Sequence, residues 1–182
     1  MEITPLLIKD ILLIQPNLHE DRRGYLYESF NQSLFNQFVK SDVNFLQDIH
    51  SHSKKNVIRG LHYQIPPKAQ AKLIRVIKGE IFDVAVDLRK NSSTFGHWIG
   101  QILNEDNRLQ MWIPEGFANG FLSLSDETDV LYKTTAEYSP SFERSIAWND
   151  PDLAISWPID ALPIISKRDA LGGAFKDAVI YV

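Results

Sequence analysis

A single histidine with basic neighbours marks the stretch of this sequence that is most suited to chemistry. Residues 59–64 read Arg-Gly-Leu-His-Tyr-Gln, and Lys72 follows eight residues after the Gln. His62 can transfer protons near neutral pH, while Arg59 and Lys72 suit a phosphate or a developing oxyanion. The stretch predicts an acid–base site beside an anion. Taken alone the signal is weak, because a lone histidine beside a glycine is more often a plain structural residue.

Two tyrosines supply a second candidate pair. Tyr132 and Tyr138 lie six residues apart in a run that alternates in the manner of a strand, Val130–Tyr138. On one regular strand this spacing sends both side chains to the same face. If that face lines the interior of a barrel, two phenols project into its cavity. The alternative is a pair of core tyrosines whose hydroxyls bond to the backbone.

Two further stretches contain arginine or glycine at turns. In Asp21–Phe30, two adjacent arginines precede Gly24 and could hold a diphosphate, although a solvated turn is the simpler interpretation. Residues Pro114–Phe121 read as a glycine-bearing turn between strands.

The elements that must position these residues are mainly short strands. Turn-forming residues recur at short intervals, and β-branched and aromatic residues fill the runs between them. Glu80–Leu88 alternates, with Phe82, Val84, Val86 and Leu88 predicted on one face and Asp83, Ala85 and Asp87 on the other. The other predicted strands are Trp98–Leu103, Leu109–Pro114, Phe121–Leu124 and Val130–Tyr138. This spacing favours an all-β sandwich, jelly roll or barrel.

Helix is expected in only two places. Ser33–Val39 places Leu34, Phe35, Phe38 and Val39 on one stripe. Ser166–Asp169 resembles a capping box, with Asp in place of the usual Glu, and opens a short helix that ends at Gly172-Gly173.

Composition excludes several classes of function. The 182 residues suit one domain, with 44% hydrophobic and 23% charged residues. The chain has no cysteine, which fits a reducing cytoplasm, and a net charge of −4, which predicts no general affinity for nucleic acid or anionic membranes. We expect no signal peptide, because MEITPLLIKD lacks a basic start and a long apolar run, and no membrane span.

Taken together and in order, these stretches resemble the dTDP-4-dehydrorhamnose 3,5-epimerase family over nearly the whole chain. The similar segments are DRRGYLYESFN, LQDIHS, VIRGLHYQIPPKAQAKLIRVIKGEIFDVAVDLRKNSSTFG, MWIPEGFANGF, VLYKTTAEYSP and WNDPDLAISWP. The resemblance implies one epimerase domain over residues 1–182, folded as a cupin-like jelly-roll β-barrel with minor helices. It also implies a cytoplasmic homodimer that uses neither metal nor organic cofactor. The implied substrate is dTDP-4-keto-6-deoxy-D-glucose, an intermediate of nucleotide-activated L-rhamnose synthesis.

The resemblance assigns roles position by position. His62 corresponds to the proton acceptor, Tyr132 to the proton donor, and Asp169 to the carboxylate that pairs with the histidine. Lys72 and Arg59 correspond to residues that hold the sugar, its keto oxygen or the diphosphate. The remaining substrate contacts fall at Arg23, Glu28, Gln47, Tyr138, Glu143 and Arg168, some of them reaching across the dimer.

Three positions depart from the family pattern. Ile49 stands where the family has Asn, Asn119 where it has His, and Arg168 where it usually has Lys. The last keeps a cation, but the first two change groups near the sugar. They leave open an epimerase that inverts one carbon only, or one that acts on another nucleotide sugar.

Two alternatives from other classes are disfavoured. A metal-dependent cupin needs several imidazole and carboxylate ligands, whereas this chain offers His62-Tyr63-Gln64 and Asn119. A sugar-binding barrel without catalysis would need no base and acid pair such as His62 and Tyr132.

Strand parity adds two structural predictions. Arg59 and His62 are three residues apart, so a bulge or bend at Gly60 is needed if both face one cavity. Arg23 and Glu28 are five apart, which the family resolves by exchanging N-terminal strands between subunits. We therefore expect a two-fold dimer whose interface includes Tyr25–Phe30.

Overall fold

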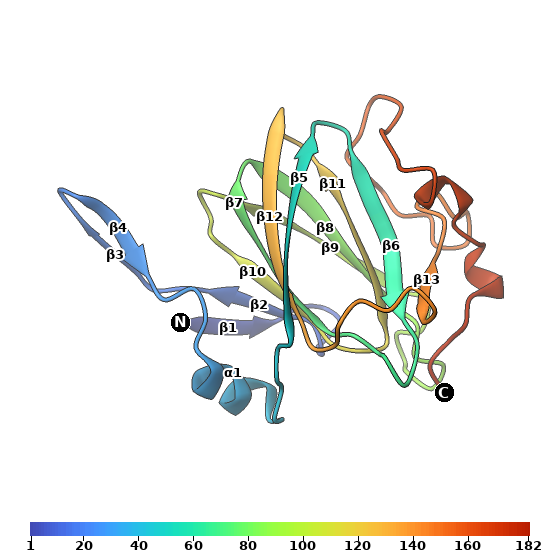
Figure 1. The fold of residues 1–182 in the computed structure, drawn as a ribbon, viewed down its shortest axis with the longest axis horizontal. Helices are drawn as coiled ribbons and strands as arrows, with labels where there is room; N and C mark the ends of the chain where they lie inside the picture. Colours follow the sequence, from blue (N-terminus) through green and yellow to red (C-terminus); the bar gives the residue numbers. More distant parts are fainter.

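Two antiparallel sheets face each other in the computed structural model, which describes all 182 residues (Figure 1). The six-stranded sheet runs β1 (Glu2–Pro5), β2 (Leu12–Gln15), β10 (Gln110–Ile113), β7 (Lys72–Lys78), β12 (Glu127–Thr134) and β5 (Gln47–Lys54). The five-stranded sheet runs β13 (Glu143–Ser145), β6 (Ile58–Gln64), β11 (Phe117–Ser123), β8 (Glu80–Asp87) and β9 (Trp98–Asn104). The prediction of an all-β fold with minor helix is confirmed.

The remaining elements are small. A separate hairpin, β3 (Leu18–Asp21) with β4 (Gly24–Tyr27), extends away from the two sheets (Figure 1). The one α-helix is α1 (Gln32–Val39), which Asn31 caps by accepting the backbone N–H of Leu34. Two short 3₁₀ turns, η1 (Asp169–Leu171) and η2 (Phe175–Asp177), lie near the C-terminus. None of these helical segments has the length and hydropathy that crossing a bilayer requires.

The space between the sheets holds the main core because alternate residues of each strand point inward. Its twelve buried side chains include Ile74, Ile81, Met111, Phe121 and Val130. The same parity sends Lys72, Asn119 and Tyr132 inward, because each lies two residues from a core position on its own strand, at Ile74, Phe121 and Val130. The inner core and the candidate site therefore share one interior.

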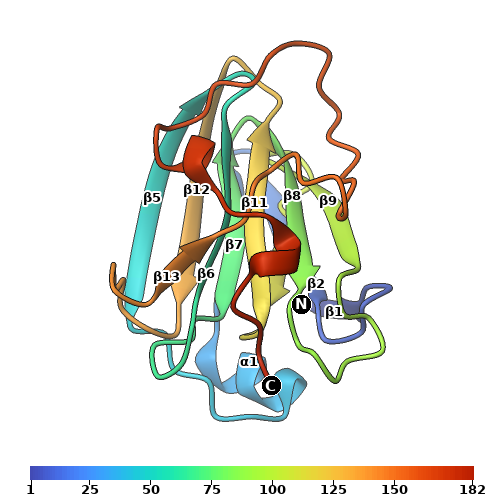
Figure 2. The ribbon, with the colours of Figure 1, turned by 90° about the vertical axis from the view of Figure 1, so that its right-hand side faces the viewer.

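Both outer faces of the sandwich are also covered. Phe35 of α1 packs with Leu73 and Trp112 on the six-stranded sheet. The C-terminal segment crosses β6, β11 and β8 of the other sheet (Figure 2), where Leu153 packs in a second buried cluster. This cover explains why β8 is buried on both faces. The two-face pattern predicted for this strand is correct, but the face that carries Asp83 and Ala85 is the inner one.

Several predicted boundaries need correction. The strand predicted as Val130–Tyr138 is β12 and ends at Thr134, so Tyr138 lies in the following loop. The stretch Pro114–Phe121, taken as a turn, contains the first five of the seven residues of β11. The stripe predicted on α1 is only half buried, since Leu34 and Phe38 are exposed while Phe35 is buried.

The bulge predicted at Gly60 is present. Opposite β11, His62 pairs with Asn119 and Arg59 with Phe121, so three steps along β6 match two along its neighbour. Gly60 takes a φ of +135°, and a Cβ there would lie 2.4 Å from the Cα of Gly120. Only glycine fits this approach. The extra residue turns both Arg59 and His62 toward the same cavity.

Candidate active site

A cavity of about 470 Å³ opens between the two sheets. Its walls are mostly polar, and they come from both sheets, from the loop after β12 and from the C-terminal segment. The lining residues are Ile49, Arg59, His62, Tyr63, Gln64, Gln70, Lys72, Tyr132, Tyr138, Glu143, Ser166, Arg168 and Asp169. Nine of the thirteen residues predicted for the site are in this wall.

His62 and Asp169 form a hydrogen-bonded pair at the centre of one wall. The Nε2 atom of His62 lies 2.7 Å from Oδ1 of Asp169, although the two residues are 107 apart in sequence. Burial would raise the pKa of Asp169, but the hydrogen bond and charge of His62 outweigh it and hold the pKa below its usual value. An ionised carboxylate in this position fixes the imidazole tautomer and stabilises its protonated form.

Ser166 places Asp169 at this point. Its hydroxyl accepts the backbone N–H of Asp169 at 3.0 Å, as a capping residue does. The turn that follows is the three-residue η1 and ends before Gly172. Of the predicted capping box, the hydrogen bond to the Ser166 hydroxyl is therefore formed. The side chain of Asp169 bonds to His62 and does not reach back to the backbone N–H of Ser166.

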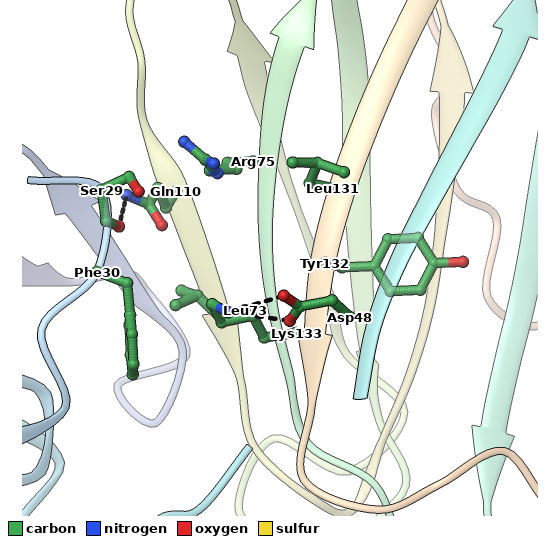
Figure 3. Close-up of a pocket in the computed structure, with 9 residues that line it drawn as sticks. All are labelled: Ser29, Phe30, Asp48, Leu73, Arg75, Gln110, Leu131, Tyr132 and Lys133. Atoms are coloured by element: carbon green, nitrogen blue, oxygen red, sulfur yellow. Dashed lines mark hydrogen bonds and ion pairs between the residues drawn. The ribbon is translucent and has the colours of Figure 1, made fainter. Parts of the chain in front are cut away.

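Tyr132 faces the cavity from the opposite sheet. It lies on β12, whereas His62 lies on β6 of the five-stranded sheet. Burial raises the pKa of Tyr132, and the charge of Arg59 partly offsets the effect, so the phenol is protonated at neutral pH. A smaller pocket of about 70 Å³ touches the same residue from the other side of the sheet. Figure 3 shows the Tyr132 hydroxyl directed away from that pocket.

Lys72 forms the base of the cavity, and Asn119 lies behind it. The Nζ atom of Lys72 lies 3.4 Å from the carbonyl oxygen of His62 and 3.4 Å from Oδ1 of Asn119. Burial lowers the pKa of Lys72 to about 8, against the opposing charges of Asp83 and Glu143. Asn119 is buried behind Lys72 and is not part of the cavity wall. Its amide nitrogen donates to Asp83 at 2.8 Å and to the carbonyl of Val84 at 3.0 Å.

A polar cluster rims the cavity on the side of the C-terminal segment. The hydroxyl of Tyr138 donates to Glu143 at 2.9 Å and accepts from Arg168 at 3.1 Å, and Arg168 also pairs with Glu143. Gln47 lies outside the wall but accepts the backbone N–H of Tyr138 at 3.0 Å, which anchors the loop. Tyr138 thus reaches the cavity from a loop, and not by the strand parity that we predicted from its spacing.

Arg59 and Ile49 complete the opposite rim. The guanidinium of Arg59 donates to the hydroxyl of Ser53 and to the carbonyl of His52, both at 2.9 Å. These bonds fix the direction of the side chain at the cavity. Ile49 pairs with Tyr132 across β5 and β12 and presents an apolar surface where the family has an amide.

Two predicted contacts lie away from the cavity of their own chain. Arg23 is at the tip of the β3–β4 hairpin, with its side chain 85% exposed and paired with Asp21. Glu28 follows the hairpin and accepts a hydrogen bond from Asn31 at 3.2 Å. Neither lines the cavity.

Sequence reasoning missed several residues of the site. Gln64 is buried, and its amide bonds to Lys68, Glu137 and Ser139, which holds the loop after β12 against β6. Asp83 was placed on a strand face but not in the site. The alternation of β8 assigned it to the face with Ala85, and recognising that face as the inner one would have indicated it. No group of three or more His, Cys, Asp or Glu side chains is arranged to hold a metal ion.

The cavity places the His62–Asp169 pair and the phenol of Tyr132 on opposite sheets, and the ammonium of Lys72 also lines it. This arrangement is typical of a β-barrel enzyme that uses acid–base catalysis on an anionic ligand. Comparison with known proteins makes this class specific. A family model described as dTDP-4-dehydrorhamnose 3,5-epimerase matches residues 5–177. The chain is 51% identical over 178 residues to the dTDP-4-dehydrorhamnose 3,5-epimerase of Pseudomonas aeruginosa, covering 98% of each chain.

Two solved structures extend the comparison. The dTDP-6-deoxy-D-glucose-3,5-epimerase of Legionella pneumophila, in complex with dTDP-4-keto-L-rhamnose, superposes with a TM-score of 0.92 at 44% identity, covering 95% of this chain and 92% of that one. A 3'-monoepimerase of Streptomyces bikiniensis in complex with dTDP-quinovose gives a TM-score of 0.89 at 34% identity, covering 93% and 86%. The chain belongs to the dTDP-4-dehydrorhamnose 3,5-epimerase family, a family of isomerases with a cupin-like jelly-roll fold.

Proposed function

We propose that this chain inverts carbons 3 and 5 of dTDP-4-keto-6-deoxy-D-glucose, the step that forms dTDP-4-keto-L-rhamnose. The observation that carries the proposal is the placement of His62, with Asp169, and Tyr132 on opposite sheets of one cavity. Inversion requires a base on one face of the sugar ring and an acid on the other. Family membership supports the choice of substrate.

The chemistry follows from the keto group at carbon 4. Hydrogens on carbons 3 and 5 both flank this carbonyl and are the acidic ones. His62 removes one of them, and Asp169 stabilises the imidazolium that forms. Tyr132 then returns a proton from the other face. Before the second carbon reacts, His62 gives its proton to water and Tyr132 takes one up. General acid–base catalysis contributes roughly 10²- to 10⁴-fold for such a group.

Lys72 is the group that we assign to the enolate. Its ammonium lies at the base of the cavity, beside the His62 carbonyl, and can hold the oxygen on carbon 4 as negative charge develops there. A hydrogen-bond donor in this role contributes on the order of 10²- to 10³-fold. Because the keto group itself makes both carbons acidic, the proposed reaction needs neither metal nor organic cofactor, and activity should survive treatment with a chelator.

The polar rim suits the nucleotide. Arg59 and Arg168 are cations at the cavity mouth, and Tyr138 offers an aromatic ring to the base. The charge of Arg168 is compensated by Glu143, whereas Arg59 donates only to the neutral Ser53 hydroxyl and His52 carbonyl. We therefore assign the diphosphate chiefly to Arg59. Gln47 acts through its bond to the Tyr138 backbone.

We further propose that the chain works as a two-fold dimer in the cytoplasm. The β3–β4 hairpin extends from the body, and Tyr25 and Leu26 on it are 57% and 74% exposed. A two-stranded hairpin alone is marginally stable in water, so a partner surface would stabilise it. In such a dimer the hairpin carries Arg23 and Glu28 to the cavity of the partner. The lack of cysteine is consistent with a reducing compartment.

A second candidate function is epimerisation at one carbon only. It is favoured by Asn119 and Ile49, which depart from the family pattern, and by the similarity to a 3'-monoepimerase. One experiment separates the two functions. The protein is incubated with dTDP-4-keto-6-deoxy-D-glucose in deuterated water, and deuterium is located by NMR. We expect label at carbons 3 and 5. Label at a single carbon would establish the second function, and no label would reject both.

A further inference from the structure

A buried carboxyl group lies directly behind the cavity and has no role in the proton transfers described above. Asp83 on β8 is completely buried, and its Oδ2 atom has no hydrogen-bond partner. Its Oδ1 atom accepts a 2.8 Å hydrogen bond from the amide nitrogen of Asn119. An acidic group that is withdrawn from water in this way is costly unless something compensates its charge.

Lys72 is the compensating cation, and Asn119 lies between the two groups. Burial raises the pKa of Asp83 to about 7, against the hydrogen bond from Asn119 and the positive charge of Lys72. Lys72 in turn is half-buried at the cavity wall, and the negative charge of Asp83 is the largest influence that favours its protonated form. Besides Asp83, the titratable groups around Lys72 are Glu143 on β13, His62 on β6 and Tyr132 on β12.

Chemistry fixes the orientation of the Asn119 amide. A carboxylate can only accept hydrogen bonds and an ammonium can only donate them. The NH₂ group must therefore face Asp83, and the carbonyl oxygen must face Lys72, which is the arrangement observed. The NH₂ group also donates to the carbonyl of Val84. Both of its donors are thus used inside the protein, which leaves none for the sugar.

We propose that Asp83 is a positioning residue for Lys72 and that it acts through Asn119. Asp83 holds the amide with its carbonyl toward the ammonium, and its negative charge keeps Lys72 protonated beside the cavity. The inference rests on the proposed function, because Lys72 matters there as the cation that holds the enolate oxygen. An imidazole at position 119 could itself take up or release a proton between the two groups. An amide cannot, so here the charges of Asp83 and Lys72 must balance each other.

The test measures the titration of Lys72 directly. The free protein is labelled with ¹³Cε-lysine and titrated by NMR, and the Lys72 signal is assigned by its absence in Lys72→Arg. Asp83→Asn keeps the shape of the side chain but removes its charge. We expect the titration midpoint of Lys72 to fall by on the order of one pH unit. Asn119→Leu should lower it as well, because Asp83 then loses its hydrogen-bond donor and takes up a proton.

Asp87→Asn is the matched control. Asp87 is equally buried and faces the same way on β8, but it pairs with Arg89 at 2.9 Å and not with Lys72. We expect it to lower thermal stability and to leave the Lys72 midpoint unmoved. An unchanged midpoint in folded Asp83→Asn overturns the proposal. A shift in Asp83→Asn without one in Asn119→Leu overturns the role of Asn119. If Asp83→Asn does not fold, Asn119→Leu decides the proposal alone.

The kinetic consequence is measured separately. The alkaline limb of kcat/KM with dTDP-4-keto-6-deoxy-D-glucose should move to lower pH in Asp83→Asn and Asn119→Leu by the same amount as the NMR midpoint. Because the NMR titration needs no substrate, it stands even if the proposed reaction is wrong. A midpoint that moves while the alkaline limb stays fixed would reject Lys72 as the enolate cation but keep Asp83 as its positioning residue.

Discussion

At the scale of single residues, the pairing of His62 with Asp169 predicts what happens when the base is replaced. His62→Asn preserves size and hydrogen bonding but cannot accept a proton. We expect hydrogen exchange at carbons 3 and 5 to fall by at least about 10³-fold, while dTDP binding changes little. Exchange is followed by NMR in deuterated water and binding by calorimetry. The exposed His97 provides the control, and His97→Asn should leave both unchanged. Undiminished exchange in His62→Asn would reject the assignment.

The lowered pKa of Lys72 predicts opposite pH trends for activity and stability. Its pKa is about 8 in the folded chain against 10.5 for the unperturbed group. Above about pH 8 the free folded protein loses the cation, so kcat/KM should fall. Between pH 8 and 10.5 the unfolded chain binds the proton that the folded chain has released, so this group adds stability as pH rises.

Lys72→Met isolates this contribution. We expect it to abolish most activity and to gain stability relative to wild type at pH 7, with the advantage shrinking toward pH 10. Thermal unfolding at several pH values measures the difference. A stability difference that stays constant between pH 7 and 10 would contradict the lowered pKa.

Asn119 stands where the family has a histidine, and a variant can test whether the amide performs the same role. Its amide donors are both bound to Asp83 and Val84, so it serves Lys72 as an acceptor and offers the sugar no donor. In the proposed mechanism, Tyr132 is the acid. Asn119→His should therefore change kcat by less than about tenfold and leave the product unchanged, as NMR of the product can show. The appearance of epimerisation at a carbon that the wild type does not invert would overturn this view.

At the scale of elements, the bulge in β6 decides whether the site can form. Gly60 combines a φ of +135° with a close approach to Gly120, where a Cβ would lie 2.4 Å from the Cα. Gly60→Ala should cost more than about 2 kcal/mol of stability and displace His62. Gly24→Ala is the control, since φ is +119° there but nothing lies within 4 Å. The difference in melting temperature between the two variants measures the clash, and equal losses would argue against it.

The elements also show where sequence reasoning succeeds and where it stops. The resemblance placed His62 and Tyr132 in one cavity. Parity then required the bulge at Gly60 if Arg59 and His62 were both to face that cavity, because alternation is a local property of the chain. The same argument failed for Tyr138, because β12 ends at Thr134 and a loop held by Gln47 and Gln64 carries the tyrosine inward. Such loop contacts join distant segments and have no periodicity to read.

Asp83 illustrates a second limit. The alternation of β8 gave its face correctly, but both faces of this strand are buried. Which one points into the site depends on the cover that the C-terminal segment lays over the outer face (Figure 2). A strand pattern alone contains no information about that cover. Arg23 and Glu28 were predicted from the family resemblance alone. Their contact with the cavity of a partner chain stays a prediction.

At the scale of the whole molecule, the exposed hairpin predicts complementation between two defective variants. If Arg23 serves the cavity of the partner, Arg23→Ala and His62→Asn should each be nearly inactive alone. After subunit exchange in a 1:1 mixture, half of the dimers are mixed, and each has one intact site. Activity should return to about a quarter of the wild-type value.

Leu26→Glu tests the same surface differently. Leu26 is 74% exposed on the hairpin, so a charge there should not unfold the chain but should weaken the dimer. Sedimentation velocity measures the mass. Glu20→Lys, on the same hairpin and exposed, changes charge without removing apolar surface and should leave the mass unchanged. No complementation together with a monomeric, fully active Leu26→Glu would exclude the dimer.

The long separation between His62 and Asp169 bears on the order of folding. All twelve side chains of the inner core lie between Ile8 and Val130, whereas Asp169 arrives with the segment that crosses the outer face of the five-stranded sheet. The barrel can therefore collapse on its own contacts before that segment docks, and the loop that docking closes is long. During refolding, the fluorescence of a variant that keeps Trp112 as its one tryptophan should report the collapse. Enzymatic activity should recover only when the segment docks and the imidazole gains its carboxylate.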